Sequence, residues 1–294
     1  MDPWRHDRPA RHERREMSTL ADMTIGVVGL GAMGGRVAER LEDAGARLLR
    51  WDADPARRSA PALGALAVAD AVLLSLPDDT ACDQVTDSLL ADARPGLLII
   101  DTSTTSPDGA RARQARAAAS GVGYVDAPVS GGPAGAESGA LTVMLGGLEA
   151  DLDRAETLLA PLAGRLLRCG GPGTGAALKL ANNLLLAGHL MLAGEAMRLA
   201  SDAGIAPETL VAALSAGSGR SAAIEVNLPK WVLSESYDSG FSLALMAKDV
   251  ALAARLANGL GPIGSSVAQQ TEAALDRFGP GADFNRLVDH GREP

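Results

Sequence analysis

The sequence predicts an α/β protein in which a doubly wound parallel sheet is followed by an all-helical domain, joined to it through a long helix. Short apolar runs alternate with helical patterns over residues 23–172, which is typical of parallel sheets with helices on both faces. Residues 173–294 show helical patterns and no strand pattern. The change falls in a glycine-rich segment, GGPGTG at residues 170–175, which we interpret as the junction of the two domains.

Composition restricts the class of protein. The chain has 294 residues, 47% of them hydrophobic, so it can bury a sizeable core in one large or two ordinary domains. Its formal net charge of −9 argues against nucleic acid or an anionic membrane as the main partner. The two cysteines, Cys82 and Cys169, are isolated, so we expect neither a disulfide framework nor a metal site.

The sequence predicts neither a membrane span nor a secretory signal. The longest uncharged apolar stretch, residues 180–194, is too short to cross a bilayer. Residues 1–16 are rich in arginine, histidine and acidic side chains and lack the apolar core of a signal peptide. We therefore expect a cytoplasmic protein whose residues 1–22 form a disordered tail.

The first βαβ unit carries a glycine motif. The run MTIGVVGL (residues 23–30) predicts a buried strand, the pattern after Gly35 a helix, and RLLRWDAD (47–54) a second strand. A GxGxxG turn joins strand to helix, and its residues are Gly29, Gly31 and Gly34, with Ala32 and Met33 inside the motif. Such glycines allow a tight turn and the close approach of a pyrophosphate to free N–H groups at the helix start. In this context the motif predicts a Rossmann-type dinucleotide-binding domain over residues 23–172.

Asp52, at the end of the second strand, bears on the choice of dinucleotide. An acidic side chain at this point accepts hydrogen bonds from the ribose hydroxyls of the adenosine half and repels a 2′-phosphate. NAD is therefore the favoured cofactor. Arg50, Arg57 and Arg58 lie close in the sequence and keep NADP open as the alternative.

Three further strands are predicted, at residues 69–76, 97–101 and 123–129. They lead into three loops, which contain Leu76-Pro77, Ser103-Thr104 and Ser130-Gly131-Gly132. The carboxyl ends of parallel strands lie at one edge of a sheet, where open α/β folds bind their ligands. We therefore expect these loops and the glycine motif to form one site.

The long helix carries the candidate proton donor. It is predicted to start near Gly175 and to end before Gly204, with Lys179 in its first turn and Asn183 one turn later on the same face. The positive end of the helix dipole and partial burial would lower the pKa of Lys179, as a general acid or base requires. Only three of the 27 basic residues are lysines, and arginine does not deprotonate in proteins. An exposed lysine without a catalytic role is the alternative interpretation.

The second domain, residues 173–294, is expected to shape the substrate pocket and the contact between subunits. Three more helices are predicted in it, at residues 207–216, 247–258 and 265–278. Their apolar faces are too extensive for a small isolated bundle. We therefore expect a second copy of the chain to cover part of them, in a homodimer or a homotetramer.

Five motifs occur in order along the chain: GLGAMG (29–34), DTSTTSP (101–107), DAPVSGGPAGAESGAL (126–141), GTGAALKLANN (173–183) and FSLALMAKDVALA (241–253). On these motifs the chain, from residue 23 to about residue 289, resembles the β-hydroxyacid dehydrogenase family, and within it the 3-hydroxyisobutyrate dehydrogenases. The resemblance implies an NAD(P)-dependent oxidoreductase. Such an enzyme interconverts a small 3-hydroxy acid and its semialdehyde by hydride transfer to or from nicotinamide.

The resemblance also implies roles for single residues. The family's general acid and base is matched by Lys179, and the residue that positions lysine and substrate by Asn183. The loop that binds the substrate carboxylate is matched by Ser130, Gly131 and Gly132. Residues that contact the cofactor are matched by Leu76, Pro77, Thr104 and Lys248. NADP-using members usually carry Asn-Arg where this chain has Asp52-Ala53, which again favours NAD.

Two other functions stay open at this point. Imine reductases resemble this fold, although they typically carry a different residue where Lys179 stands. A non-catalytic nucleotide-binding protein could keep the same shape, but the presence of Lys179, Asn183 and Ser130 speaks against it. The substrate is also open, because 3-hydroxyisobutyrate, tartronate semialdehyde, glyoxylate and succinic semialdehyde are all small carboxylates.

Overall fold

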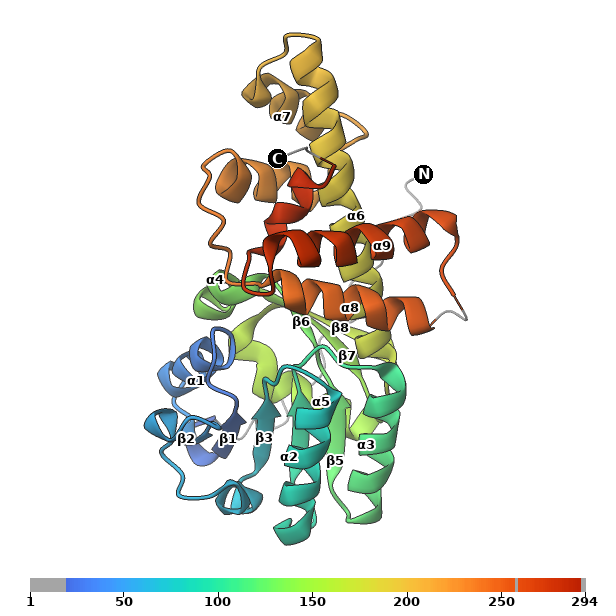
Figure 1. Cartoon of the computed structure of the whole chain (residues 1–294). Coiled ribbons are helices and arrows are strands. Elements are labelled where there is room, and N and C mark those ends of the chain that lie inside the picture. Colours follow the sequence, from blue (N-terminus) through green and yellow to red (C-terminus); the bar gives the residue numbers. More distant parts are fainter. Residues whose placement is uncertain (1–19, 257–258, 292–294) are drawn as a thin grey trace, which may run out of the picture.

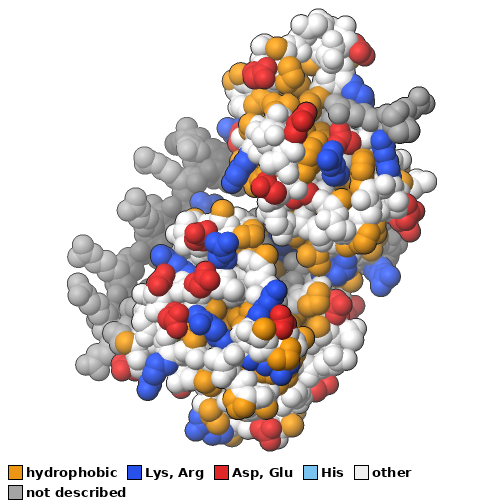
Figure 2. Space-filling view, turned by 60° about the vertical axis from the view of Figure 1, so that its left-hand side comes forward, with side chains coloured by type: hydrophobic (Ala, Val, Ile, Leu, Met, Phe, Trp, Pro, Cys, Tyr) orange, Lys and Arg blue, Asp and Glu red, His pale blue; other side chains and the backbone are white. Residues whose placement is uncertain are grey.

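The fold is known from a computed structural model that describes residues 20–256 and 259–291. A sheet flanked by helices forms one lobe, and a group of helices lies over the carboxyl edge of its strands (Figure 1). Figure 2 shows the two lobes in space-filling form, with a narrower waist between them. Most of the predicted tail, residues 1–19, lies outside the described residues, while Leu20–Asp22 form a short 3-10 helix, η1.

Eight strands form a single sheet: β1 (Thr24–Val28), β2 (Arg47–Trp51), β3 (Ala71–Leu74), β4 (Leu98–Asp101), β5 (Gly123–Asp126), β6 (Val129–Ser130), β7 (Leu141–Gly146) and β8 (Ala163–Gly170). Their order is β2-β1-β3-β4-β5-β7-β6, and β8 pairs with β7. The first five strands are parallel, which confirms the predicted doubly wound sheet. Strand β7 runs antiparallel to β5 and β6 and parallel to β8.

The end of the sheet differs from the prediction. The strand expected over residues 123–129 stops at Asp126, and a separate two-residue strand, β6, begins at Val129. Pro128 lies in the break, and a proline has no N–H to donate to a neighbouring strand. Strands β7 and β8 were not predicted from the sequence.

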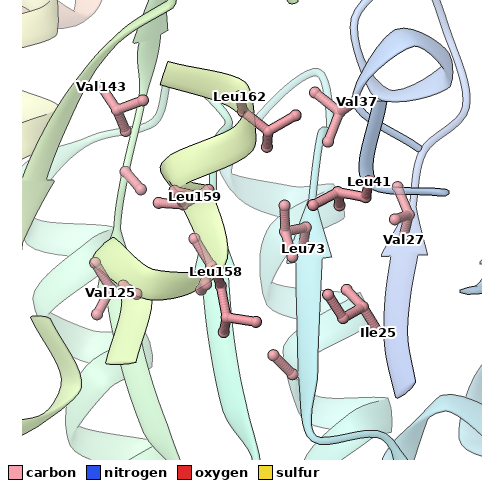
Figure 3. Close-up of a cluster of buried hydrophobic side chains, with 14 of the residues drawn as sticks. Ile25, Val27, Val37, Leu41, Leu73, Val125, Val143, Leu158, Leu159 and Leu162 are labelled. Carbon is pink, nitrogen blue, oxygen red and sulfur yellow. The ribbon is translucent and has the colours of Figure 1, made fainter. Parts of the chain in front are cut away.

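Helices cover both faces of the sheet. Those of the first lobe are α1 (Gly34–Asp43), α2 (Asp79–Asp92), α3 (Pro107–Ala119), α4 (Gly132–Ser138) and α5 (Glu149–Leu159), with the short 3-10 helices η2 (Pro55–Arg57), η3 (Leu63–Val68) and η4 (Ala160–Leu162). Alternate strand residues point to opposite faces, so Ile25, Val27 and Leu73 pack with α1 and α5 in one apolar cluster (Figure 3). On the other face, Val28, Val72 and Leu74 pack with α2 and α3.

Helix α6 (Thr174–Asp202) connects the two lobes and packs against β7 and β8 near its start and against the helical lobe beyond. By length and composition it could cross a membrane. No other helix within residues 20–256 and 259–291 is both long and apolar enough to do so. The helix has 29 residues, whereas the uncharged stretch that the sequence analysis judged too short for a membrane has 15. We interpret it as a core helix, because Ala187, Leu190 and Met191 are buried among residues of the neighbouring helices.

The helical lobe contains α7 (Pro207–Ala216), α8 (Leu243–Leu256) and α9 (Pro262–Phe278), with a ten-residue π-helix, η5 (Ala223–Val232), and a 3-10 helix, η6 (Phe284–Asp289). Over the described part of this lobe the only β-type pairing is a single bridge between Ser242 and Asp283, as an all-helical domain predicts. Helix α8 begins four residues earlier than expected. Its predicted end at Asn258 lies outside the described residues.

Candidate active site

The glycine turn after β1 has the shape that a pyrophosphate requires. Gly29 has a φ of +86°, and a Cβ there would lie 2.2 Å from the carbonyl oxygen of Ser75. A Cβ on Gly34 would lie 1.8 Å from the carbonyl oxygen of Gly29. Gly31, in contrast, is exposed and has no neighbouring atom within 4 Å of its Cβ position, so a ligand can approach the backbone closely.

The start of α1 is open to an anion. Met33 precedes the helix and packs partly against the core, while Ala32 is exposed. No side chain of the described residues caps this helix, so its first N–H groups are available to a phosphate. Residues 29–34, which were predicted to contact the cofactor, therefore form one continuous turn that fits the phosphates of a dinucleotide.

Asp52 follows β2 beside this turn, at the position expected for a ribose. Its carboxylate accepts hydrogen bonds from the N–H groups of Leu30 (2.6 Å) and Asp54 (2.8 Å). Partial burial works to raise the pKa of this carboxyl, but the two hydrogen bonds and the charges of Arg57 and Arg58 outweigh it, and the pKa is lowered. The side chain is thus ionised and still partly accessible.

Strand order gives the cleft its direction. The strands after β1 lie on both of its sides, β2 on one and β3 on the other, so the glycine turn stands where the connections diverge. A dinucleotide bound there would place its adenosine half toward Asp52 and its nicotinamide half toward the loops after β3 and β4.

These two loops lie side by side. The N–H of Leu76 donates to the Oγ of Ser103 over 2.8 Å, and the hydroxyl of Thr102 donates to the carbonyl oxygen of Leu74 over 2.6 Å. Leu76 is half-buried and Pro77 is exposed. The structure therefore brings Leu76-Pro77 and Ser103-Thr104 together at the carboxyl edge of the sheet, as the sequence predicted.

Lys179 lies in the second turn of α6, because the helix begins at Thr174. The prediction that it lies in the first turn is wrong. Burial lowers the pKa of Lys179 to about 8, with a further lowering by Lys248 and an opposing influence of Asp249. The predicted depression of its pKa is therefore confirmed, and burial is its largest cause.

Asn183, one turn beyond Lys179, is held by hydrogen bonds from both ends of its amide. Its Nδ2 donates to the carboxylate of Asp249 (2.6 Å), and its Oδ1 accepts from the Nδ2 of Asn182 (3.0 Å). Both Asn183 and Asp249 are only 1% exposed. This pair therefore fixes α6 to α8 at the level of Lys179.

Lys248 connects the helical lobe to the loop after β4. Its Nζ lies 3.0 Å from the carboxylate of Asp249 and donates to the carbonyl oxygen of Thr104. Residues predicted to contact the cofactor, Thr104 and Lys248, therefore contact each other across the two lobes.

Ser130, Gly131 and Gly132 form the turn from β6 into α4: Ser130 ends the strand and Gly132 begins the helix. Gly131 and Gly132 have φ values of +125° and +62°, which favour glycine, and both are exposed. Pro133, the next residue, faces the helical lobe: a Cβ on Gly240 would lie 3.1 Å from its ring. The predicted carboxylate-binding loop thus borders the cleft between the lobes.

Two family models match most of the chain, one in each lobe. Residues 24–171 match the NAD-binding domain of 6-phosphogluconate dehydrogenase, and residues 173–290 match the model described as NAD-binding of NADP-dependent 3-hydroxyisobutyrate dehydrogenase. The mitochondrial 3-hydroxyisobutyrate dehydrogenase of Drosophila melanogaster is 34% identical over 94% of this chain and 91% of its own length. The chain belongs to the β-hydroxyacid dehydrogenase family.

Two further relatives agree with this family. The 2-(hydroxymethyl)glutarate dehydrogenase of Eubacterium barkeri is 35% identical over 78% of this chain and 80% of its own length. The structure of Mycobacterium tuberculosis 3-hydroxyisobutyrate dehydrogenase with L-serine superimposes with a TM-score of 0.85 at 32% identity, covering 92% of this chain and 99% of that one. The protein is accordingly an NAD(P)-dependent dehydrogenase.

Imine reductases share the fold at greater distance. The enzyme from Myxococcus stipitatus superimposes with a TM-score of 0.62 at 19% identity, covering 92% of this chain and 99% of that one. This likeness shows the fold alone. The resemblance to imine reductases predicted from the sequence is therefore confirmed for architecture, whereas the stronger matches are to β-hydroxyacid dehydrogenases.

Two buried carboxylates of this β-hydroxyacid dehydrogenase escaped the sequence analysis. Asp249 is one of two charged residues in the apolar segment 241–253, a pattern that indicates a buried pair. Asp126 accepts hydrogen bonds from the N–H groups of Gly173 (2.7 Å) and Ala176 (2.8 Å), so it caps the helix that carries Lys179. Burial raises the pKa of Asp126 to about 6.

Proposed function

We propose that the protein oxidises a small 3-hydroxy acid to its semialdehyde, and catalyses the reverse reduction, with Lys179 as the general acid and base. The observation that carries this proposal is the half-buried Lys179 between the lobes, with its pKa lowered to about 8. A lysine with this pKa is partly neutral near pH 7 and can act as a base, whereas a solvated lysine is almost wholly protonated.

Each residue then has a defined task. When bound, the nicotinamide ring accepts or supplies the hydride. Lys179 takes the hydroxyl proton during oxidation and returns a proton to the carbonyl oxygen during reduction. Asn183, fixed by Asp249, positions the lysine and the substrate oxygen. The hydroxyl of Ser130 and the N–H groups of Gly131 and Gly132 bind the substrate carboxylate.

The relatives narrow the substrate class that we propose. The molecules in their names, 3-hydroxyisobutyrate, 2-(hydroxymethyl)glutarate and L-serine, share one arrangement, a CH₂OH group and a carboxylate on the same carbon. They differ only in the third group on that carbon. We therefore favour a 2-substituted 3-hydroxypropanoate over a shorter acid such as glyoxylate or a longer one such as 4-hydroxybutyrate.

NAD is the cofactor that we propose, on the evidence of Asp52. Its carboxylate is ionised beside the position of the adenosine ribose and would repel a 2′-phosphate. The neighbouring arginines are already engaged: Arg57 lies 3.4 Å from the carboxylate of Asp54, and Arg58 donates to the carbonyl oxygen of Ala53 (3.0 Å) and packs over Trp51. Asp52→Ala should reduce the preference for NAD by about tenfold, as judged by kcat/KM with both cofactors. An unchanged ratio would exclude Asp52 as the ribose-binding residue.

An activity panel tests the reaction itself. It would compare 3-hydroxyisobutyrate, 2-(hydroxymethyl)glutarate and L-serine with 4-hydroxybutyrate, each with NAD⁺ and NADP⁺. It would also include reduction of a cyclic imine with NADH and with NADPH. We expect the largest kcat/KM for one of the first three, and loss of activity in Lys179→Met. A larger kcat/KM for the imine would favour an imine reductase, and NADH binding without turnover of any compound would favour a non-catalytic role.

A homodimer is the oligomeric state that we propose. Leu178, Leu185, Leu192 and Leu199 recur every seventh residue along α6 and are 44%, 61%, 62% and 74% exposed. A row of large apolar side chains on one helix is typical of a face that packs against another subunit. Replacement of Leu185 and Leu192 by glutamate should convert the dimer to a monomer in sedimentation velocity, while Val68→Glu, on the other lobe, should not. A monomeric wild-type protein would contradict the proposal.

A cytoplasmic location completes the proposal. Both cysteines, Cys82 and Cys169, are free thiols, which agrees with a reducing compartment. Fractionation of the source cells with an antibody against the protein would test it, and recovery with membranes or in the medium would contradict it.

A further inference from the structure

An arginine occupies the buried face of α3, where an apolar side chain is expected. Arg113 lies three residues after Ala110 and four before Ala117, and all three are buried. Its side chain is 0% exposed. A buried guanidinium is costly unless its N–H groups are paired, so its partners indicate why it is there.

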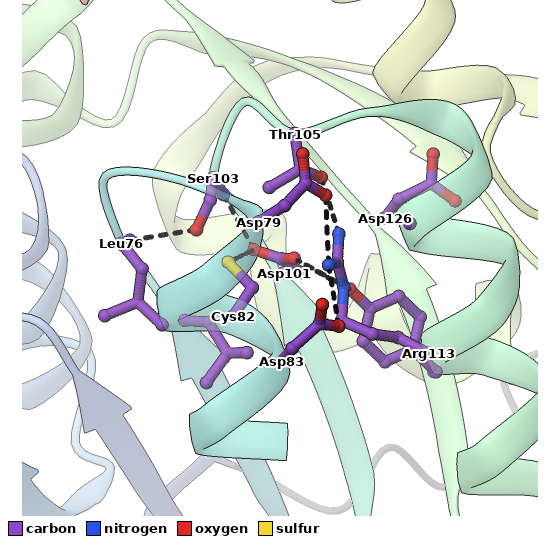
Figure 4. A network of polar contacts seen from close by, with 12 residues as sticks. Leu76, Asp79, Cys82, Asp83, Asp101, Ser103, Thr105, Arg113 and Asp126 are labelled. Atoms are coloured by element: carbon purple, nitrogen blue, oxygen red, sulfur yellow. Dashed lines mark hydrogen bonds and ion pairs between the residues drawn. The ribbon is translucent and has the colours of Figure 1, made fainter. Parts of the chain in front are cut away.

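Those partners come from three separate segments of the chain (Figure 4). Its Nε donates to the hydroxyl of Tyr124 (2.8 Å), and its Nη2 donates to the hydroxyl of Thr105 (2.8 Å). Its Nη1 donates to the carboxylates of Asp79 (3.1 Å) and Asp83 (3.2 Å) on α2. All three nitrogens of the guanidinium are therefore engaged.

The partners of Arg113 connect it to the loops after β3 and β4, which border the cleft. The first connection is to the loop after β4. Thr105 itself belongs to the loop after β4. The carboxylate of Asp79 accepts from the N–H (2.9 Å) and the hydroxyl (3.1 Å) of Ser106. Arg113 is thus connected to two successive residues of this loop, directly at Thr105 and through one carboxylate at Ser106.

A second route reaches the loop after β3. The hydroxyl of Tyr124 donates to the carboxylate of Asp101 (2.7 Å), which accepts from the N–H of Ser103 (3.0 Å). The Oγ of Ser103 in turn accepts from the N–H of Leu76 (2.8 Å). This chain of hydrogen bonds requires the protonated phenol, and burial raises the pKa of Tyr124 well above its ordinary value.

We propose that Arg113 is a positioning residue that holds the loops after β3 and β4 in the shape that receives the nicotinamide half of the cofactor. Lys248 holds the same loop from the other side, at the carbonyl oxygen of Thr104. The inference rests on the proposed function only in taking these loops as the nicotinamide side of the cleft. Arg113 lies behind them and touches neither cofactor nor substrate.

The experiment compares two ligands that differ in the nicotinamide half. NADH spans the whole cleft, whereas ADP, which lacks the second ribose and the nicotinamide, occupies only the turn after β1 and the region of Asp52. For Arg113→Lys, which keeps the charge and loses the planar fork, we expect the Kd for NADH to rise about tenfold and the Kd for ADP to change less than twofold. A general loss of structure would weaken the binding of both ligands to the same extent.

Arg116→Met is the matched control. Arg116 lies on the same helix and pairs with the same Asp83 (2.8 Å) and with Asp87 (2.9 Å), but among the residues described it makes no hydrogen bond of its own to either loop. Its Kd values for both ligands should equal those of the wild type. Thr105→Val, which removes one partner of Arg113 and little volume, keeps the test decisive if Arg113→Lys does not fold.

The outcomes separate the hypotheses. A selective loss of NADH affinity in Arg113→Lys or Thr105→Val supports the positioning role. Equal losses of affinity for NADH and ADP, or no loss for either, overturn it. Because binding needs no turnover, failure of the proposed reaction in the substrate panel would leave this test intact.

Discussion

The cluster around Arg113 and the cluster around Lys179 lie at the same edge of the sheet, and each contains a cation close to a buried carboxylate, Asp101 or Asp249. Arg113 is fully buried and donates hydrogen bonds from every nitrogen of its guanidinium. Lys179 is half-buried, and within the described residues its Nζ has no hydrogen-bond partner, only the nearby charges of Asp249 and Lys248.

This difference follows from what each cation is able to do. Arginine stays protonated and presents a planar set of donors, so it suits a fixed network. Lysine can lose its proton when burial lowers its pKa, and an amine with few partners is free to exchange that proton with a substrate. The cluster around Arg113 fixes the positions of the loops, and the cluster around Lys179 allows a proton to be transferred.

The largest effect is expected from Lys179→Arg. It keeps the charge but replaces the amine with a guanidinium, which does not deprotonate in proteins, so we expect turnover to fall by roughly 10²–10⁴. The Kd for NADH, measured by fluorescence titration, should stay near the wild-type value. Arg113→Lys should show the reverse pattern, with weakened NADH binding. A Lys179→Arg variant that turns over at the wild-type rate would remove the distinction between the clusters.

Arg113→Met should cause the larger loss of stability. It leaves Asp101 and the phenol of Tyr124 without their cation in a buried setting, and we expect the free energy of unfolding to fall by about 3–5 kcal/mol. Urea denaturation followed by circular dichroism measures this change. Arg116→Met, which removes ion pairs from the same helix at the surface, should cost less than about 1 kcal/mol. Equal losses for the two variants would mean that burial of Arg113 adds nothing.

Lys179→Met should change stability in the opposite direction and raise the free energy of unfolding at neutral pH. Folding lowers the pKa of Lys179 from its ordinary value of 10.5 to about 8, so the folded protein binds this proton more weakly than the unfolded chain. The charged lysine therefore costs stability below pH 8, and the cost disappears as the pH rises from 8 to about 10.5. At pH 7 we expect a gain of about 1–3 kcal/mol in the free energy of unfolding, together with loss of activity. A less stable variant at pH 7 would contradict the lowered pKa.

The parts of the fold predicted from the sequence are those with local signals. The glycine turn, the apolar runs before polar loops and the length of α6 are all written in neighbouring residues. Strand β8 was missed because it is largely exposed, with partly buried residues at every third position, a spacing closer to that of a helix than of a strand. The division of β5 from β6 did have a local signal, Pro128, because a proline has no N–H to donate to a neighbouring strand.

The site divides in the same way. Lys179 and Asn183 could be predicted because one helical turn separates them, and Asp52 because it directly follows an apolar strand. Asp249 reaches Asn183 from 66 residues away, and Arg113 reaches Asp79 from 34 residues away, distances at which no periodicity connects two residues. For Arg113 one signal existed, since its spacing from Ala110 and Ala117 places it on a buried face.

The pH dependence of kcat/KM in both directions tests most directly whether Lys179 moves the proton. Oxidation needs the neutral amine, so log kcat/KM should rise with pH and level off above about pH 8, the pKa of Lys179. Reduction needs the ammonium form, so log kcat/KM should fall above the same pH. Arg113→Lys should retain this break, and Lys179→Arg should lose it from its residual activity. A break near pH 8 that persists in Lys179→Arg, or its absence from the wild type, would contradict the account.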